Sequence, residues 1–181
     1  MFPNNWFSTH AGGHVAVHAM RSPSRRRERR SDVIEQLKTA YRVQDVIDYS
    51  GLEQDGLFLE GTGAMVLDHI ARVAYTARSH RADPLALERF CTHFRYEPTV
   101  FDTADASGQP IYHTNVLMCV ATTFAAFAGN AIELSGQGGR LVPLAVPTVE
   151  MAGGSVRCMI AGVHLSPRQQ PPQGLRGPQY A

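Results

Sequence analysis

The strongest constraint on the fold is an amphipathic helix predicted over residues 84–94. Pro84 stands in its first turn, where a proline is tolerated because its missing N–H would have no helical partner there. Four apolar residues follow at helical spacing and so share one face: Leu87, Phe90, Cys91 and Phe94. Short apolar segments of strand length flank this helix at 72–77 and 99–101. One face of this helix is therefore expected to be buried, with strands before and after it in the chain.

A second helix is predicted to begin at Asp32, with Glu35 three residues later in capping-box spacing. Its apolar face consists of Val33, Ile34, Leu37 and Tyr41. Segments 14–20 and 43–49 read as strands before and after it. His14 and His18 alternate with apolar residues, and we interpret them as solvent-facing positions of a half-buried strand in preference to metal ligands.

Composition bounds the class of protein. The chain has 181 residues, of which 44% are hydrophobic and 18% charged, with a net charge of +1. These values fit one soluble domain and give no overall attraction to nucleic acid or membrane. The N-terminus lacks the pattern of a secretory signal, and the three cysteines have no metal-type spacing. We therefore expect a cytoplasmic protein without a metal or other cofactor.

A basic run covers residues 21–30 and contains six arginines. One hypothesis is a patch that binds phosphate or nucleic acid. The run is short, has no interleaved aromatic residues and stands alone in the chain. We therefore favour a solvated loop that turns one or two arginines into a site.

Three polar residues stand beside apolar segments. Glu60 follows an apolar strand and precedes Gly-Thr-Gly, which indicates either a carboxylate held at a sharp turn or an exposed acid in a hairpin. His113 stands at the mouth of an apolar strand, as a site residue or as a surface residue. Cys158 follows two glycines and adjoins Arg157, so it is either an activated thiolate or a small buried hydrophobe. Cys119 lies inside an apolar run and is predicted to be structural.

Taken together, these segments resemble the amidinotransferase/dimethylargininase superfamily, the penteins, and within it the citrulline-utilisation hydrolases. The motifs that carry the resemblance are FPNNW (2–6), SPSRRRERR (22–30), FLEGTGAMVLD (58–68), the Arg81 loop, IYHTNVLMCV (111–120), FAGNAIEL (127–134) and GGSVRCMIA (153–161). The resemblance implies a five-bladed α/β propeller of ββαβ units around a central site. Family members are longer, so we expect an incomplete propeller domain over 1–165, shortened at its N-terminus and internally. A disordered tail rich in Pro, Gln and Gly is expected over 166–181.

The resemblance also implies roles for individual residues. Cys158 becomes the nucleophile, His113 the general acid and base, and Glu60 the carboxylate that holds the substrate nitrogens. The positions that align with substrate-binding residues are Asn4, Asn5, Arg25 or Arg26, Arg81 and Asn115. Thiolate attack on a guanidino or ureido carbon would give a covalent thio-intermediate, which water hydrolyses with the help of His113.

The substrate expected from this set is a small amino acid. Arginine-directed members of the superfamily commonly have acids where this chain has Asn4, Asn5 and Asn115. An amide both donates and accepts hydrogen bonds, which suits a neutral ureido group. We therefore expect citrulline, converted to ornithine, to suit the site better than arginine or a methylated arginine.

Two other functions stay open at this level. The chain could be an inactive, truncated pentein that binds a ligand or assembles as a homo-oligomer. It could also be a nucleic-acid-binding module that uses residues 21–30, although we expect no nucleic-acid or membrane partner.

Overall fold

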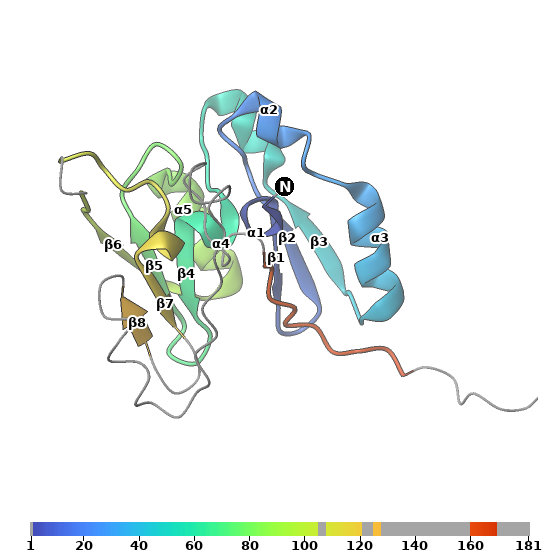
Figure 1. Cartoon of the computed structure of the whole chain (residues 1–181). Helices are drawn as coiled ribbons and strands as arrows, with labels where there is room; N and C mark the ends of the chain where they lie inside the picture. Colours follow the sequence, from blue (N-terminus) through green and yellow to red (C-terminus); the bar gives the residue numbers. More distant parts are fainter. Residues whose placement is uncertain (1, 105–107, 121–124, 128–159, 170–181) are drawn as a thin grey trace, which may run out of the picture.

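The computed structural model describes residues 2–104, 108–120, 125–127 and 160–169 (Figure 1). Cys158 lies outside these residues, as do most of the GGSVRCMIA motif, most of the FAGNAIEL motif and the segment 141–149. Two three-stranded sheets stand side by side, and a two-stranded hairpin lies beside the second of them.

The first sheet belongs to a ββαβ unit. β1 (Phe7–His10) pairs antiparallel with β2 (His14–Val17), and Phe7 lies opposite Val17. The chain then passes through α2 (Pro23–Arg26) and α3 (Ser31–Ala40) to β3 (Asp45–Asp48), which pairs parallel with β2. The crossover contains a helix, as a parallel connection requires.

The second sheet repeats this order. β4 (Met65–Asp68) pairs antiparallel with β5 (Val73–Ala77), and α5 (Pro84–Phe94) leads to β6 (Glu97–Phe101), which is parallel to β5. Asp83 caps α5, because its carboxylate accepts hydrogen bonds from the N–H groups of Leu85 (2.9 Å) and Ala86 (3.3 Å). A hairpin of β7 (Met118–Val120) and β8 (Ala125–Phe127) follows. The α/β class is thus confirmed, whereas closure into a propeller stays a prediction.

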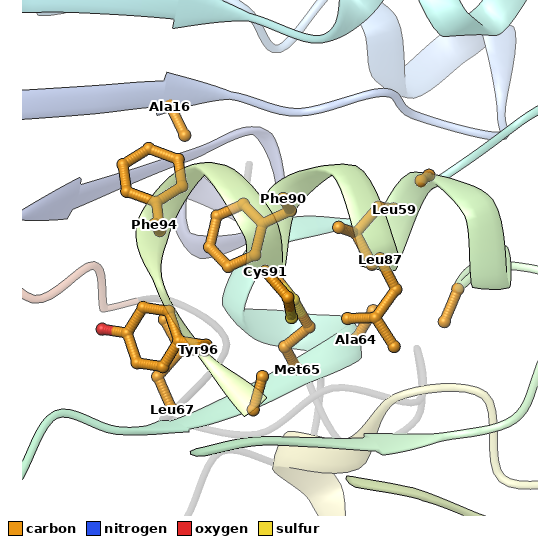
Figure 2. Packing of buried hydrophobic residues seen from close by; sticks show 13 residues of the cluster. Ala16, Leu59, Ala64, Met65, Leu67, Leu87, Phe90, Cys91, Phe94 and Tyr96 are labelled. Carbon is orange, nitrogen blue, oxygen red and sulfur yellow. The ribbon is translucent and has the colours of Figure 1, made fainter. Parts of the chain in front are cut away.

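The main core lies where α5 packs between the two sheets (Figure 2). Phe90 is fully buried and Phe94 almost so, with Ala16 of β2 on one side and Met65 of β4 on the other. Cys91 is buried in the same cluster, as its helical spacing predicts. Truncating a buried aromatic residue such as Phe90 to alanine typically costs about 3–5 kcal/mol. This core therefore fixes the first unit against the second.

Two local predictions are wrong. His18 is fully buried, because it directly follows β2, the central strand of the first sheet, and its ring lies near Tyr49 and Phe90 with Nε2 2.8 Å from the Ser8 hydroxyl. His14 is half-exposed, and its Nδ1 lies 2.6 Å from Asp45 Oδ1. The capping box at Asp32 does not form either. α3 begins one residue earlier with Arg30 as its N-cap, and the Asp32 carboxylate pairs with the Arg30 guanidinium instead. A neighbouring cation competes successfully for an exposed carboxylate.

Residues 160–169 run along the first ββαβ unit. Leu165 is buried in the core of β1, β2 and α3. Pro167 bridges to Tyr41, and the Arg168 N–H donates to the Ala40 carbonyl (2.9 Å). The rest of the predicted tail lies outside the described residues. Across those residues, no helix has the length and apolar character to cross a bilayer.

Candidate active site

Three single helical turns stand directly before the strands β1, β4 and β7. They are α1 (Pro3–Trp6), α4 (Gly61–Ala64) and η2 (Thr114–Val116, a 3-10 turn). Their N-caps are Phe2, Glu60 and His113, each five residues before the first residue of the strand that follows. α4 contacts both α1 and η2. This repeated geometry brings together Glu60, His113 and the asparagines of α1, which are far apart in the sequence.

The strand predicted directly after His113 begins only at Met118, because η2 lies between them. Within the FPNNW motif, α1 covers Pro3–Trp6, and β1 follows at Phe7. Glycine explains how closely α1 and α4 approach. Gly61 has φ +46°, and a Cβ there or at Gly63 would overlap the Asn4 carbonyl or the Asn5 amide. The Gly-Thr-Gly motif is therefore required by packing as well as by the turn.

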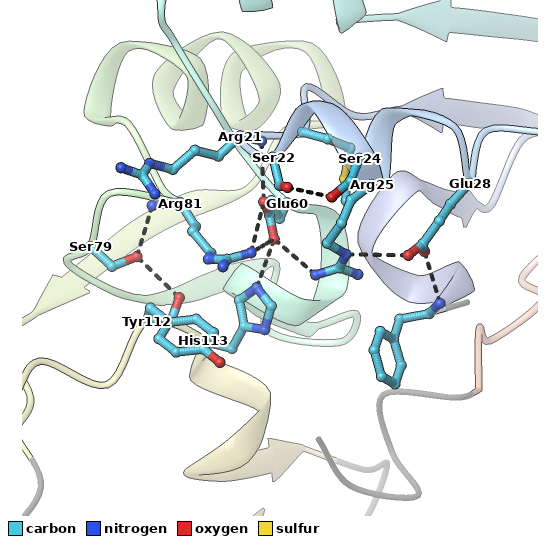
Figure 3. A network of polar contacts seen from close by, with 12 residues as sticks. Arg21, Ser22, Ser24, Arg25, Glu28, Glu60, Ser79, Arg81, Tyr112 and His113 are labelled. Carbon is cyan, nitrogen blue, oxygen red and sulfur yellow. Dashed lines mark hydrogen bonds and ion pairs between the residues drawn. The ribbon is translucent and has the colours of Figure 1, made fainter. Parts of the chain in front are cut away.

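Glu60 is the centre of the polar network in Figure 3, and its side chain is 0% exposed. Oε2 accepts from His113 Nε2 and from Arg81 Nη1, both at 2.9 Å, and lies 3.5 Å from Arg25 Nη1. Oε1 accepts from the backbone N–H of Arg21 (3.2 Å). The alternative of an exposed acid in a hairpin is therefore wrong.

Burial alone would raise the pKa of the Glu60 carboxyl, because it disfavours the charged form. The hydrogen bond from His113 and the positive charge of Arg81 outweigh that effect and lower the pKa to about 2. Glu60 is therefore a carboxylate at neutral pH. Its role is that of a fixed negative charge rather than a proton donor.

His113 is buried, and burial lowers the pKa of its imidazole against the opposing pull of Glu60. The neutral ring donates from Nε2 to Glu60, so Nδ1 carries the lone pair that can accept a proton. Thr114 anchors this turn: its hydroxyl accepts from the Ala77 N–H (2.7 Å) and donates to the Ala64 carbonyl (2.5 Å). The imidazole is thus held between two strand ends with a base available at Nδ1.

Arg25 and Arg26 point to different partners. The Arg25 guanidinium contacts Glu60 and donates to the Asn5 side-chain oxygen (2.8 and 3.0 Å), with that amide oriented to accept. Arg26 instead pairs with Glu53 (3.0 Å) and donates to the Met20 carbonyl (2.9 Å). Of the two arginines left open by the sequence, Arg25 is the one at the Glu60 cluster.

Arg81 is fixed by the backbone and by an aromatic ring. Its carbonyl accepts from the Glu60 N–H (3.1 Å), and its guanidinium lies 4.6 Å from the centre of the Tyr112 ring. Such a cation–π contact orients the planar guanidinium without neutralising it. Arg81 Nε is buried and has no hydrogen-bond partner among the described residues, so the side chain retains a donor there.

The structure therefore brings together five predicted site residues: Asn5, Arg25, Glu60, Arg81 and His113. Asn4 and Asn115 are buried on the adjoining turns α1 and η2. Cys158 lies outside the described residues. Sequence reasoning missed Glu28, which binds both Arg25 and the Phe2 N–H, although a single acid inside an arginine run was a usable signal.

The chemistry of this cluster is that of a carboxylate beside an imidazole, flanked by two guanidinium groups. Among the described residues, no three His, Cys, Asp or Glu side chains are grouped so as to hold a metal ion. A cavity of about 220 Å³ runs beside β1, β4 and β7, but its lining includes neither Glu60 nor His113. We assign the candidate active site to the Glu60 cluster, because the paired titratable groups are there.

Solved structures with a similar fold include the N-terminal domain of an arginine dihydrolase. The chain is similar to the N-terminal domain of ArgZ, an arginine dihydrolase of Cyanobacteria, in a variant bound to substrate (17% identity, TM-score 0.52). It is also similar to a variant of that domain covalently bound to a reaction intermediate (16% identity, TM-score 0.53). In both cases the match covers 75% of this chain and 48% of the other. A variant of AgrE with L-arginine matches 75% of this chain and 20% of its own length (18% identity, TM-score 0.52).

The chain thus spans about half the length of the ArgZ domain. No match is found among curated proteins. The family model described as N,N dimethylarginine dimethylhydrolase, eukaryotic, matches residues 1–138, which is most of the chain. The sequence motifs indicated the pentein superfamily, and the closer resemblance to citrulline-utilisation hydrolases stays a prediction. The match over 1–138 shows that the chain belongs to the dimethylarginine dimethylhydrolase family, within that superfamily.

Proposed function

We propose that this protein is a cysteine-dependent hydrolase that acts on the guanidino or ureido carbon of an arginine-like amino acid. The observation that carries the proposal is the buried Glu60–His113 pair with Arg25 and Arg81 beside it, in a chain of this family. ArgZ, which has the same fold, is named an arginine dihydrolase. The proposed domain covers residues 1–165.

Glu60 and His113 have distinct tasks in this mechanism. The Glu60 carboxylate accepts hydrogen bonds from the N–H groups of the substrate and holds the reacting carbon in place. His113 takes the thiol proton on Nδ1 and returns it to the departing nitrogen, so that an amine or ammonia leaves. The lowered pKa of His113 supports this role, since a neutral ring is ready to accept a proton.

Cys158 is proposed as the nucleophile. Its sulfur bonds to the substrate carbon as the bond from that carbon to the leaving nitrogen breaks. Water then adds to the same carbon, gives a proton to His113, and the carbon–sulfur bond breaks to restore the thiolate. Support comes from the residues that follow: the Thr9 hydroxyl donates to the Gly162 carbonyl (3.0 Å) and accepts from the His164 N–H (2.7 Å). Cys158 precedes Gly162 by four residues, and Asn5 precedes Thr9 by the same number. Because Gly162 and Thr9 are bonded to each other, this equal spacing supports a position for Cys158 in the same site as Asn5.

Arg81 is proposed to bind the α-carboxylate of the substrate, with Arg25 as a second cation nearby. The free Nε donor of Arg81 leaves its guanidinium able to make another hydrogen bond while Nη1 remains on Glu60. Asn4 and Asn5 supply neutral amides on the adjoining turn.

The charge balance favours citrulline over arginine. Glu60 already faces two guanidinium groups, and the buried side chains of Asn4 and Asn5 add no negative charge. A third guanidinium would meet repulsion there, whereas a neutral ureido group would not. We therefore propose that kcat/KM is higher for citrulline than for arginine or a dimethylated arginine.

The test is turnover of all three substrates by purified protein, with ornithine and citrulline as the measured products. Turnover by the wild type and by Cys119→Ala, lost in Cys158→Ala, is the expected result; Cys119→Ala is the matched control for removing a thiol. Folded protein that leaves every substrate unchanged would reject the hydrolase and support the alternative, an inactive pentein that binds a ligand or a second copy of itself. Faster turnover of arginine would overturn only the proposed substrate order.

A further inference from the structure

A second glutamate, Glu53, has a largely covered side chain and binds the segment that carries Arg25. Glu53 belongs to η1 (Ser50–Asp55, a 3-10 helix), and its side chain is only 8% exposed. Oε1 accepts from the Met20 N–H (2.7 Å) and from Arg29 Nη1, while Oε2 accepts from Arg29 Nη2 (3.1 Å) and pairs with Arg26 Nε (3.0 Å). One carboxylate therefore binds the segment 20–29 at its beginning, its middle and its end.

This segment carries two contacts to Glu60. Two neighbouring backbone N–H groups bind the two glutamates: that of Met20 donates to Glu53, and that of Arg21 donates to Glu60. Arg25 reaches Glu60 and Asn5 from α2, next to Arg26, which Glu53 holds. α2 is a single turn without a side-chain cap and has no buried residue, so it has little stability of its own. Its position depends on contacts such as those with Glu53.

Charge adds to this dependence. Removing the Glu53 carboxylate would leave Arg26 and Arg29 without that counter-charge, close to Arg21 and Arg25. Repulsion among these like charges would then displace the segment from the site. The displacement would weaken the contact between Arg25 and Glu60, although Glu53 does not touch Glu60. Among the polar contacts of the described residues, Glu53 touches neither Glu60 nor His113, so an effect on the site would pass through this segment.

We propose that Glu53 is a positioning residue: it places Arg25 and the Arg21 N–H against Glu60 and thereby sets substrate affinity. This inference rests on the proposed function for its kinetic consequence. Since Arg25 would hold the substrate equally before and during reaction, weakening it should raise KM and leave kcat nearly unchanged.

The experiment compares Glu53→Gln with Glu35→Gln, which removes an exposed carboxylate paired with Lys38 on α3. We expect Glu53→Gln to raise KM for the better substrate about tenfold, with kcat within about threefold of wild type, as one weakened charge-assisted contact predicts. Glu53→Asp should restore part of the affinity. Arg25→Ala combined with Glu53→Gln should be no worse than Arg25→Ala alone, because both changes act on one contact. Additive losses, or a fall in kcat with unchanged KM, would overturn the proposal.

A second measurement does not depend on turnover, and it does not require Glu53→Gln to be as stable as the wild type. The Nε–H signal of Arg25, followed by NMR in protein labelled on arginine nitrogen, should shift and exchange faster in Arg26→Gln, which removes one contact to Glu53. The same signal should stay unchanged in Glu35→Gln. If wild-type protein proves inactive, the proposed function fails while this signal still decides the role of Glu53. If neither Arg26→Gln nor Glu53→Asp changes the Arg25 Nε–H signal, Glu53 is not a positioning residue.

Discussion

Glu60, which is buried, and Glu53, whose side chain is largely covered, each contact arginines and each accept a hydrogen bond from a backbone N–H of the same segment. They differ in what else they touch. Glu60 also contacts an imidazole, His113, and lies on a turn packed against buried asparagines. Within the described part of the chain, the polar contacts of the Glu53 carboxylate are with guanidinium and backbone groups only.

The comparison shows that a carboxylate among arginines does not by itself mark a site. Both arrangements satisfy a buried charge, which is necessary wherever a glutamate is removed from water. A titratable partner and neutral hydrogen-bonding amides distinguish Glu60. The basic run 21–30 follows the same logic: Arg25, Arg26 and Arg29 are occupied by Glu28, Glu53 and Glu60, which disfavours a nucleic-acid surface.

The largest expected effect separates the two glutamates by rate. Glu60→Gln should lower kcat about a thousandfold, because the fixed charge that orients the reacting carbon is lost. Glu53→Gln should change kcat by less than about threefold, as an indirect role requires. Steady-state kinetics of both variants checks the contrast. Equal losses of kcat would remove the distinction drawn here.

As the pH falls, protonation of buried histidines should destabilise the fold before protonation of the carboxylates does. Burial lowers the pKa of His10 from 6.5 to about 2 and that of His18 to about 3. Each neutral histidine therefore stabilises the fold fully above pH 6.5, and this contribution is lost as the pH falls toward the folded pKa. The free energy of unfolding should drop by about 1.4 kcal/mol per pH unit for each histidine below pH 6.5.

Glu60 joins this loss only below pH 4.5, where the unfolded carboxyl takes up protons that the folded one, with its pKa of about 2, does not. Denaturant unfolding between pH 7 and 4 measures the slope. A flat profile from pH 6.5 to 4.5 would show that His10 and His18 are not buried as neutral rings.

The contact between α1 and α4 gives the next effect. Gly63→Ala should lower kcat/KM about a hundredfold, because the new methyl group overlaps the Asn5 amide and displaces a group beside Arg25. Gly51→Ala is the matched control, since a Cβ there meets no atom within 4 Å. Kinetics and thermal unfolding of both variants provide the test. Wild-type activity in Gly63→Ala would mean that Asn5 does not need this position.

The smallest effect concerns stability. Glu53→Gln should lower the free energy of unfolding by about 2 kcal/mol, because two partly exposed arginines lose their counter-charge. Glu35→Gln should change it by less than about 0.5 kcal/mol, as for other exposed ion pairs. Urea unfolding distinguishes the two. Similar values for both variants would reduce Glu53 to an ordinary surface charge.

The sequence could predict the elements whose pattern is local. The apolar spacing of α5, with Cys91 on its core face, and the Gly-Thr-Gly turn after Glu60 required no knowledge of distant contacts. The candidate site came from motifs in family order, which marked Glu60, His113 and Arg81 and left Arg25 and Arg26 as alternatives. The sequence could not predict the full burial of His18 or the failure of the Asp32 capping box. Both features depend on which groups contact the side chain in the folded protein, and the local sequence does not determine those contacts.

The role of Glu53 was invisible for the same reason, since its three attachments are 24 to 33 residues away in the sequence. The one-turn helices before β1 and β7 were also missed, and the one before β4 was expected only as a sharp turn. Each contains too few residues to produce a helical period, and packing rather than propensity forms it.

The central claim is that the Glu60–His113 pair serves a nucleophilic thiol at Cys158. The most direct measurement is the intact mass of the protein, quenched in acid during turnover of arginine or citrulline. The account predicts an adduct of the substrate less ammonia, located on Cys158 by peptide mapping, which accumulates when His113→Asn slows its hydrolysis and is absent in Cys158→Ala. Turnover without any adduct on Cys158, or an adduct that persists in Cys158→Ala, would contradict the claim.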